Sequence, residues 1–509
     1  MGARRAGVSA AYLSVGGAVH MLGTIVGFAI LSRLMTRSLY GQFQQVWLVV
    51  SIVGAVTVLG LPHSMQYFAP LLPLQSQRRR FFVRTMVMLE LAALGGGFAI
   101  WLFADPLSRV FTGTADLAPL LRSCWPMVLF FAFGAQSARF FTGTENPMLA
   151  AGSAAACGVA FALSLGGAAF FTKSVENLAL SNAVGTGVVF AVSVVIGYMT
   201  IGSLGDREGL AGAPPSAGIW SQLRFALPLT GGIVAATAGR LLSRTLVSHY
   251  YAAEEYAVYA NGAVELPLGL ILGGAVAGVL QARLARACAA REMVRAVSLV
   301  HLTVGSTSLL IYPVAIFVTL FARDCMVALF GAKYAASGWV FMVFSLSMIL
   351  RTYEPYSVIN ATGKTRVTFL MTILWLGGSL CGCWFGILLF GPIGAAAGTV
   401  LALTAVHVCY MFVVAWAIGS SVRRVLPWAQ MGRTMAASVL AVASAAWTFL
   451  IPMHPIVRLL VGAAVAGAVY VLLVHKLGAL QPQHRAFLRE ALARFRSKKP
   501  QPPADLSEE

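Results

Sequence analysis

Charged residues are scarce in this sequence. Asp, Glu, Lys and Arg make up only 10% of its 509 residues, whereas a soluble globular domain carries about 25%. Acidic residues are the rarest, 17 against 36 Lys and Arg, which gives a formal net charge of +19. Hydrophobic residues make up 59% of the chain. This composition excludes an ordinary soluble domain and indicates a chain that lies mostly within a lipid bilayer.

The sequence also lacks the motifs of common catalytic centres. Its seven cysteines form no paired CxxC zinc pattern. It contains no Walker motif, HExxH or nucleophile elbow, which excludes ATP-driven transport within the chain. No outer loop exceeds about twenty residues, whereas an independent domain needs about 50 or more. We therefore expect no enzyme activity, metal or cofactor, with a membrane glycosyltransferase or polysaccharide polymerase as an alternative.

The chain does have long apolar segments. A bilayer core about 30 Å thick is crossed by about 20 apolar residues at 1.5 Å each. Segments of this kind predict an all-α polytopic membrane protein with about 14 transmembrane helices, at 9–32, 43–72, 84–104, 117–137, 148–171, 178–202, 225–249, 258–283, 298–321, 336–357, 367–390, 393–418, 432–451 and 455–475.

The loops between the predicted helices differ in their content of arginine and lysine. With the amino terminus inside, outer loops are poorer in basic residues, and the inner loops hold Arg78, Arg79, Arg80, Arg84, Arg283, Arg286, Arg291, Arg295, Lys364, Arg366, Arg423, Arg424 and Arg433. This bias predicts that both termini are cytoplasmic, in a bacterial inner membrane. The positive charge thus indicates contact with anionic membrane lipid and gives no support for a nucleic-acid partner.

Two sequence echoes suggest an internal duplication. Tyr40-Gly41-Gln42-Phe43 is matched by Tyr256-Ala257-Val258-Tyr259, and Phe141-Thr142-Gly143 by Ala361-Thr362-Gly363, at offsets of 216 and 220 residues. An even number of helices per repeat predicts parallel lobes related by an axis along the membrane normal. We expect six-helix lobes at 1–212 and 213–420 and two additional helices at 421–480. Residues 481–509 are expected to form a basic amphipathic helix on the cytoplasmic surface and a disordered tail.

Short motifs at the helix junctions carry a family resemblance. They are Leu31-Ser32-Arg33-Leu34, Tyr40-Gly41-Gln42-Phe43, Gly60-Leu61-Pro62, Phe225-Ala226-Leu227-Pro228 and Ala361-Thr362-Gly363-Lys364. In this order they resemble polysaccharide exporters, or lipid-linked oligosaccharide flippases, of the multidrug/oligosaccharidyl-lipid/polysaccharide (MOP) superfamily. The resemblance implies two six-helix lobes around a central cavity, alternating access, and a cargo of oligosaccharide on a polyprenyl diphosphate.

One difference from the related lipid II flippases bears on which cargo is expected. Related lipid II flippases carry Arg-Asp after a Gly-Phe-Ala in the first helix, whereas Gly27-Phe28-Ala29 is followed here by Ile30-Leu31. This favours an O-antigen or exopolysaccharide repeat unit, with polysaccharide polymerase machinery as a further partner. The alternative is a multidrug exporter of the same superfamily, although its cavity would favour acidic or aromatic residues, and the charges here are mainly arginines.

Arginines within the predicted helices are candidate substrate ligands. A guanidinium is costly in hydrocarbon and needs a partner or a purpose, and its paired donors suit a diphosphate. Arg240 and Arg244 share one face of the seventh helix through their i, i+4 spacing. Arg33 and Arg37 have the same spacing at the end of the first helix, and the repeat would bring them towards Arg240 and Arg244. Arg139 is a further candidate; each of these arginines has the alternative of reaching the membrane interface.

Uncharged polar side chains near the ends of the second helix suit sugar hydroxyls, although such residues are usually solvated. They are Gln44, Gln45, His63 and Gln66.

Three further residues are candidates for coupling transport to H⁺ or Na⁺. Glu265 precedes Pro267, lies one turn from Asn261, and could bind a cation with a freed carbonyl; a salt bridge to Arg240 or Arg244 is the alternative. Glu90 lies in the third helix. Arg351 and Glu354, at i, i+3, are expected to form a structural ion pair.

Overall fold

The computed structural model describes residues 2–72, 74–129, 141–142, 146–203, 218–264, 266, 284, 287–288, 290, 292–353, 355–362 and 364–480. All regular secondary structure in these ranges is helical. The amino-terminal half contains α1 (Gly2–Leu34), α2 (Arg37–Thr57), α3 (Leu61–Phe68), η1 (Ala69–Leu71), α4 (Gln75–Leu102), α5 (Ala104–Thr112), α6 (Ala118–Cys124), η2 (Trp125–Val128), α8 (Pro147–Phe171) and α9 (Val175–Ser203).

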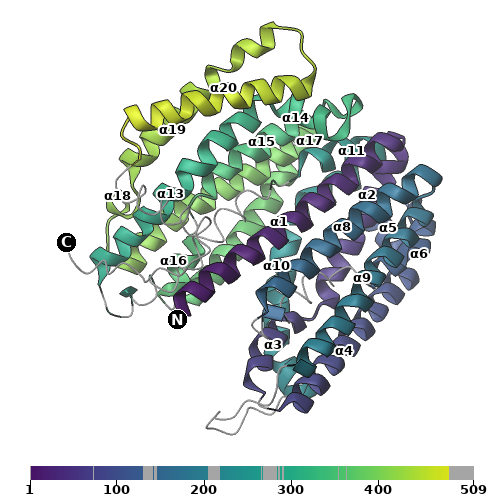
Figure 1. Cartoon of the computed structure of the whole chain (residues 1–509). Coiled ribbons are helices and arrows are strands. Elements are labelled where there is room, and N and C mark those ends of the chain that lie inside the picture. Colours follow the sequence, from purple (N-terminus) through teal and green to yellow (C-terminus); the bar gives the residue numbers. More distant parts are fainter. Residues whose placement is uncertain are drawn as a thin grey trace.

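The second half repeats this succession of long and short helices. It contains α10 (Ile219–Tyr250), α11 (Ala253–Gly262), α13 (Met293–Leu320), α14 (Ala322–Phe330), η3 (Ala332–Tyr334), α15 (Ser337–Leu350), α16 (Pro355–Ala361) and α17 (Thr365–Ile418). After a short α18 (Val422–Val425), the hairpin of α19 (Trp428–Ala443), η4 (Ala446–Leu450) and α20 (Pro455–Lys476) packs against α13 and α14 at the edge of the bundle (Figure 1).

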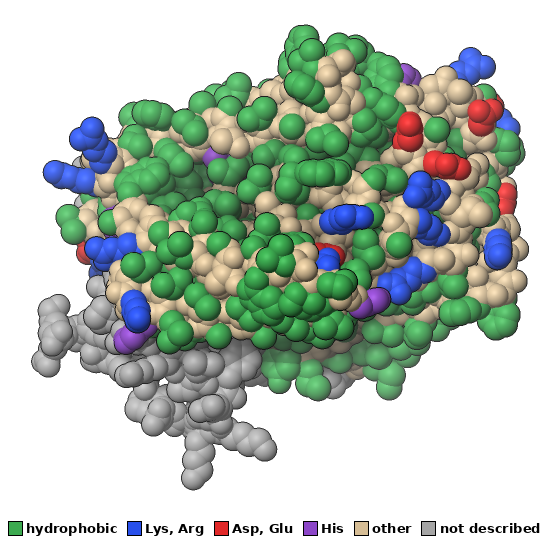
Figure 2. Space-filling view, turned by 90° about the horizontal axis from the view of Figure 1, so that it is seen from above, with side chains coloured by type: hydrophobic (Ala, Val, Ile, Leu, Met, Phe, Trp, Pro, Cys, Tyr) green, Lys and Arg blue, Asp and Glu red, His purple; other side chains and the backbone are tan. Residues whose placement is uncertain are grey.

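These helices confirm the predicted all-α polytopic fold. Ten helices in the described ranges are long and apolar enough to cross a membrane. One of them, α17, holds two predicted spans, which meet at Gly391 (φ 64°, ψ −146°). Charged side chains gather towards opposite ends of the molecule, and hydrophobic side chains cover most of the surface between them (Figure 2). The chain is therefore a multi-pass membrane protein.

Backbone breaks divide two spans that hydropathy predicts as continuous. The span at 43–72 is split into α2 and α3 at Leu59 and Gly60, which both have positive φ. The span at 336–357 is split into α15 and α16. The predicted spans 117–137 and 258–283 run into residues outside the described ranges, and so does the predicted amphipathic segment 481–509.

Two short helices, α5 and α14, lie at equivalent places in the two halves. Each follows a phenylalanine, Phe103 or Phe321, and each ends at a glycine with positive φ, Gly113 (70°) or Gly331 (94°). The two phenylalanines are 218 residues apart, and so are the two glycines. This separation is close to the 216 and 220 residues between the matching sequence segments. This supports the duplication, while the lobe boundaries at 212 and 420 stay predictions.

Small residues set the packing within the first half. Gly16 and Gly23 of α1 lie directly against the backbone of Ala151 and Gly158 in α8, so that an added Cβ would lie 2.5 and 2.3 Å from these backbones. Such contacts let helix backbones touch in lipid, where packing rather than hydrophobicity drives association. As a result α1 runs along α8 (Figure 1).

Replacing Gly158 should separate these helices. In Gly158→Val the Cβ would lie 2.5 Å from the His20 Cα, and overpacking of this kind costs about 1–3 kcal/mol. We expect a lower midpoint of thermal unfolding in detergent. Gly167→Val on the same helix, where nothing lies within 4 Å of the added Cβ, is the control and should leave the midpoint unchanged. Equal midpoints for the two variants would contradict the close packing.

Candidate functional site

Arg240 lies on a face of α10 that is buried at both ends. Gln222 precedes it by eighteen residues, about five helical turns, and Val247 follows by seven, about two turns, so all three project to the same side. Gln222 and Val247 are fully buried, whereas Arg240 is exposed. Ala226, on this side too, packs against Gly60 of the first half. By this spacing Arg240 lies on the side of α10 that packs against the first half at Gly60, and its own side chain is exposed.

Arg244, one turn further along, is anchored. Its Nη2 donates to the carbonyl oxygen of Ala263 at 2.6 Å. Ala263 caps the end of α11, where carbonyls lose their intrahelical partners. Arg240 makes only a local bond in the described part of the chain, from Nη2 to Thr237 Oγ1 at 3.2 Å. Among the described residues, Arg244 is therefore held by a bond to the end of α11, whereas Arg240 is held only by a bond within its own helix.

A buried amide joins the two halves near the start of α10. Gln222 Nε2 donates to Ser64 Oγ at 2.9 Å and to Thr85 Oγ1 at 2.8 Å. Its Oε1 accepts from Arg84 Nη2 at 3.2 Å. Ser64, Thr85 and Gln222 are all fully buried. The sequence alone does not reveal this junction, because a glutamine just before an apolar segment looks like an ordinary solvated helix end.

A second polar junction lies where α2 meets α11. Gln44 Nε2 donates to the Tyr40 hydroxyl at 2.7 Å, and that hydroxyl donates to Asn261 Oδ1 at 2.6 Å. All three residues are buried, as is Gln45. Gly41 packs directly against the backbone of Ala253. Asn261 and Gln44 therefore lie in the contact between the halves, and Asn261 already uses its oxygen as an acceptor.

Arg33 and Arg37 also cross between the halves, but they contact α14 and η3 instead of α10. Arg33 Nε donates to Leu329 O at 3.2 Å and its Nη2 donates to Ala328 O. Arg37 donates to Lys333 O. These carbonyls end α14 or follow it, so they attract the guanidinium groups. Both arginines thus bond to carbonyl oxygens of the second half, and their expected approach to Arg240 and Arg244 stays a prediction.

A matching contact exists in the opposite direction. His249 Nδ1 lies 2.8 Å from Val110 O in α5. His249 is 216 residues after Arg33, and Val110 is 219 residues before Leu329. Lys333 Nζ adds a bond to Met35 O. Burial, and to a smaller extent the Arg37 charge, lowers the pKa of Lys333. These contacts join the two halves in both directions. We call this set of contacts, made by Arg33, Arg37, His249 and Lys333, the gate.

The other predicted site residues lie on α3, on α4 and at the end of α15, or outside the described residues. His63 is half-buried on α3, which packs against α10. Glu90 is half-buried on α4 and makes no hydrogen bond or ion pair within the described residues. Arg351 is exposed at the end of α15, and its pairing with Glu354 stays a prediction. Outside the described residues lie Arg139, Glu265, Glu354 and the side chain of Gln66.

Removing the Gln222 amide should weaken the junction between the halves. Gln222→Met keeps the side-chain length but leaves the Ser64 and Thr85 hydroxyls without this partner, at a cost of about 1–3 kcal/mol. We expect a lower midpoint of thermal unfolding. Arg224→Met, an exposed residue on the same helix, is the control. An unchanged midpoint in Gln222→Met would show that the amide does not stabilise the contact.

No protein-family model matches this chain, and no curated protein matches it in sequence. Its fold does match solved structures. The lipid II flippase MurJ in an inward closed conformation superposes with a TM-score of 0.66 and 13% identity, over 91% of this chain and 99% of that chain.

Multidrug transporters have a similar fold over a smaller part of the chain. An inward-facing multidrug resistance MATE family transporter of the MOP superfamily gives a TM-score of 0.61 and 14% identity, over 81% of this chain and 98% of its own. The MATE transporter VcmN of Vibrio cholerae, solved as a point mutant, gives 0.57 and 15%, over 82% and 97%. The chain thus has the fold of the MOP superfamily, which confirms the resemblance at the level of fold.

Proposed function

We propose that this membrane protein is a flippase, which moves an oligosaccharide linked to polyprenyl diphosphate across the bacterial inner membrane by alternating access. The cargo is an O-antigen or exopolysaccharide repeat unit, and both termini are cytoplasmic. The observation that carries this proposal is the exposed Arg240 on the face of α10 that is turned towards the first half.

The position of Arg240 suits a diphosphate that crosses the membrane. Arg240 lies ten residues before the end of α10 at Tyr250, or about 15 Å along the helix, and we expect this position to lie inside a hydrocarbon core about 30 Å thick. A guanidinium at this depth is costly unless a water-filled cavity or an anion accompanies it. Bidentate hydrogen bonds to phosphate oxygens would satisfy it. Arg244, already fixed by Ala263, adds positive charge on the same helix face.

The extent of the fold match supports a flippase over the multidrug alternative. The MurJ match covers 91% of this chain and the two MATE matches 81% and 82%. The difference is comparable with the share of the chain occupied by α19, η4 and α20. A multidrug exporter of cationic compounds would also gain from acidic groups in its cavity, whereas the exposed charge on this face of α10 is an arginine.

Ion coupling and polymerase contact are further parts of this proposal. Proton or sodium binding would involve Glu90, which has no partner within the described residues, together with Glu265. Asn261 is a weaker candidate ligand, because its oxygen accepts from Tyr40. Polysaccharide polymerase machinery would take up the delivered glycan, and anionic lipid would contact the basic cytoplasmic loops.

Substitution of the α10 arginines tests the proposed function. A charge-assisted hydrogen bond contributes about 1.5–3 kcal/mol, so Arg240→Ala should weaken binding of undecaprenyl diphosphate by about 10-fold or more. Arg240→Ala with Arg244→Ala should abolish flipping of a lipid-linked oligosaccharide in proteoliposomes. The assay follows protection of the sugar from a membrane-impermeant lectin.

Arg224→Ala provides the matched control, because Arg224 is exposed on α10 but lies about 160° around the helix from Arg240. It should flip cargo at the parent rate. Parent-like flipping by the double variant would refute the assignment of these arginines. Loss of dye export with no effect on the lipid-linked cargo would instead favour a multidrug exporter.

A further inference from the structure

We propose that Arg458 of α20 is a positioning residue for the gate, and that the α19–α20 hairpin holds the gate closed through α14. The proposal requires the two halves to separate at the gate, as alternating access implies, but it does not depend on the identity of the cargo.

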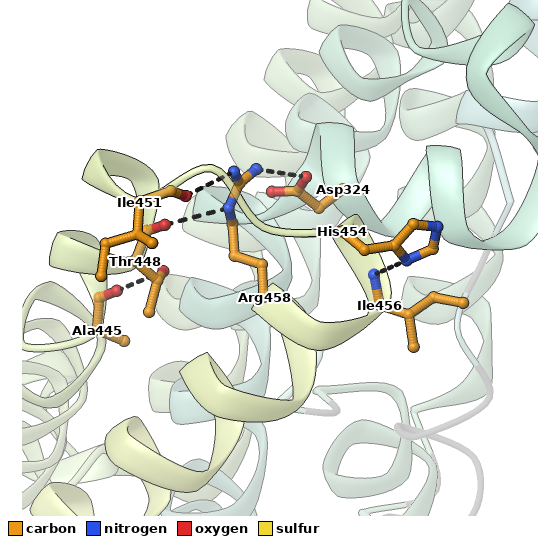
Figure 3. A network of polar contacts seen from close by, with 7 residues as sticks. All are labelled: Asp324, Ala445, Thr448, Ile451, His454, Ile456 and Arg458. Atoms are coloured by element: carbon orange, nitrogen blue, oxygen red, sulfur yellow. Dashed lines mark hydrogen bonds and ion pairs between the residues drawn. The ribbon is translucent and has the colours of Figure 1, made fainter.

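The Arg458 guanidinium joins three segments of the chain (Figure 3). Its Nη1 donates to Asp324 Oδ1 of α14 at 3.0 Å, its Nε to Thr448 O at 3.3 Å, and its Nη2 to Ile451 O at 3.4 Å. The side chains of Arg458 and Asp324 are only 17% and 7% exposed. A buried ion pair with additional carbonyl partners is strongly disrupted when one member is removed.

Aromatic packing fixes the same contact. Phe321, the residue before α14, stacks on Phe449 of η4 with ring centroids 4.8 Å apart, and Arg458 lies over the Phe449 ring at 5.4 Å. Gly462 of α20 lies so close that an added Cβ would be 2.9 Å from Phe321. The hairpin is therefore locked to the beginning of α14.

The other end of α14 forms part of the gate. Ala328 and Leu329 accept hydrogen bonds from Arg33, and Phe330 O accepts one from Ser32 Oγ at 3.3 Å. Asp324 and Ala328 are one helical turn apart, so α14 is a short rigid connection. Whatever fixes its beginning also fixes the carbonyls that Arg33 needs.

The first half contains an ion pair that is equivalent to the pair of Asp324 and Arg458. Asp105 at the start of α5 is 219 residues before Asp324, and it pairs with Arg122 of α6 in its own half. The residues 218 and 219 positions after Arg122 are Val340 and Phe341, which are buried and apolar. At these positions the second half has no basic residue that could pair with Asp324, and the appended hairpin supplies Arg458 instead. This gives the hairpin a role in the transport cycle beyond crossing the membrane.

A buried cysteine in the gate tests the proposal without any cargo. Ser32 is fully buried, so Ser32→Cys should react slowly with a water-soluble thiol reagent, after subtraction of the rate of the parent with its native cysteines. Adding Arg458→Met should raise this rate by about 10-fold, within the range of ordinary conformational coupling. A rate within about twofold of that of Ser32→Cys alone would overturn the proposal.

Arg122→Met is the matched control, because it breaks the equivalent pair of the first half, which is 43% and 49% exposed. It should leave the Ser32→Cys rate unchanged, and an equal acceleration would show general loosening and overturn the proposal. Asp324→Asn keeps the side-chain shape and should accelerate labelling even if Arg458→Met does not fold. Failure of cargo flipping alone would leave these rates unaffected, so the two proposals are tested separately.

Discussion

Polar groups in a bilayer must find partners within the protein, and here many of those partners lie in the other half of the chain. Gln222 binds Ser64 and Thr85, Tyr40 binds Asn261, and Arg33 binds the end of α14. Water offers an alternative partner to each of these groups once a cavity opens. Contacts of this kind can therefore be exchanged during a transport cycle, which continuous apolar packing would resist.

Close contacts between backbones occur within a half as well as between the halves. The α1–α8 contact is built from Gly16, Gly23 and Gly158, whose backbones touch those of the neighbouring helix. Since lipid competes poorly with such close contacts, α1 and α8 are expected to move together. Between the halves, Gly41 and Gly60 pack as closely against Ala253 and Ala226, so this interface contains both close backbone contacts and polar contacts that water can replace. Alternating access requires this interface to open while the units on either side stay intact.

The sequence predicted most of this fold, because lipid imposes a length and an apolar composition on each span. It did not predict α5 and α14, which are too short for a hydropathy window, or the break at Leu59 and Gly60, where backbone conformation overrides hydropathy. It placed Arg240 among the candidate ligands, and the structure leaves that side chain exposed. It could not distinguish Arg240 from Arg33, since helical spacing says nothing about which carbonyls a neighbouring element presents. Arg458 was missed for the same reason, and Gln222 was missed because a glutamine just before an apolar segment looks like a solvated helix end.

The most direct test of the account is the accessibility of position 240 to water. Arg240→Cys in proteoliposomes should react with a membrane-impermeant thiol reagent, and undecaprenyl diphosphate should slow the reaction. Val184→Cys, on the exposed apolar side of α9, should stay unreactive because lipid covers it. If Arg240→Cys is as unreactive as Val184→Cys, the arginine faces hydrocarbon and the proposed translocation path does not exist.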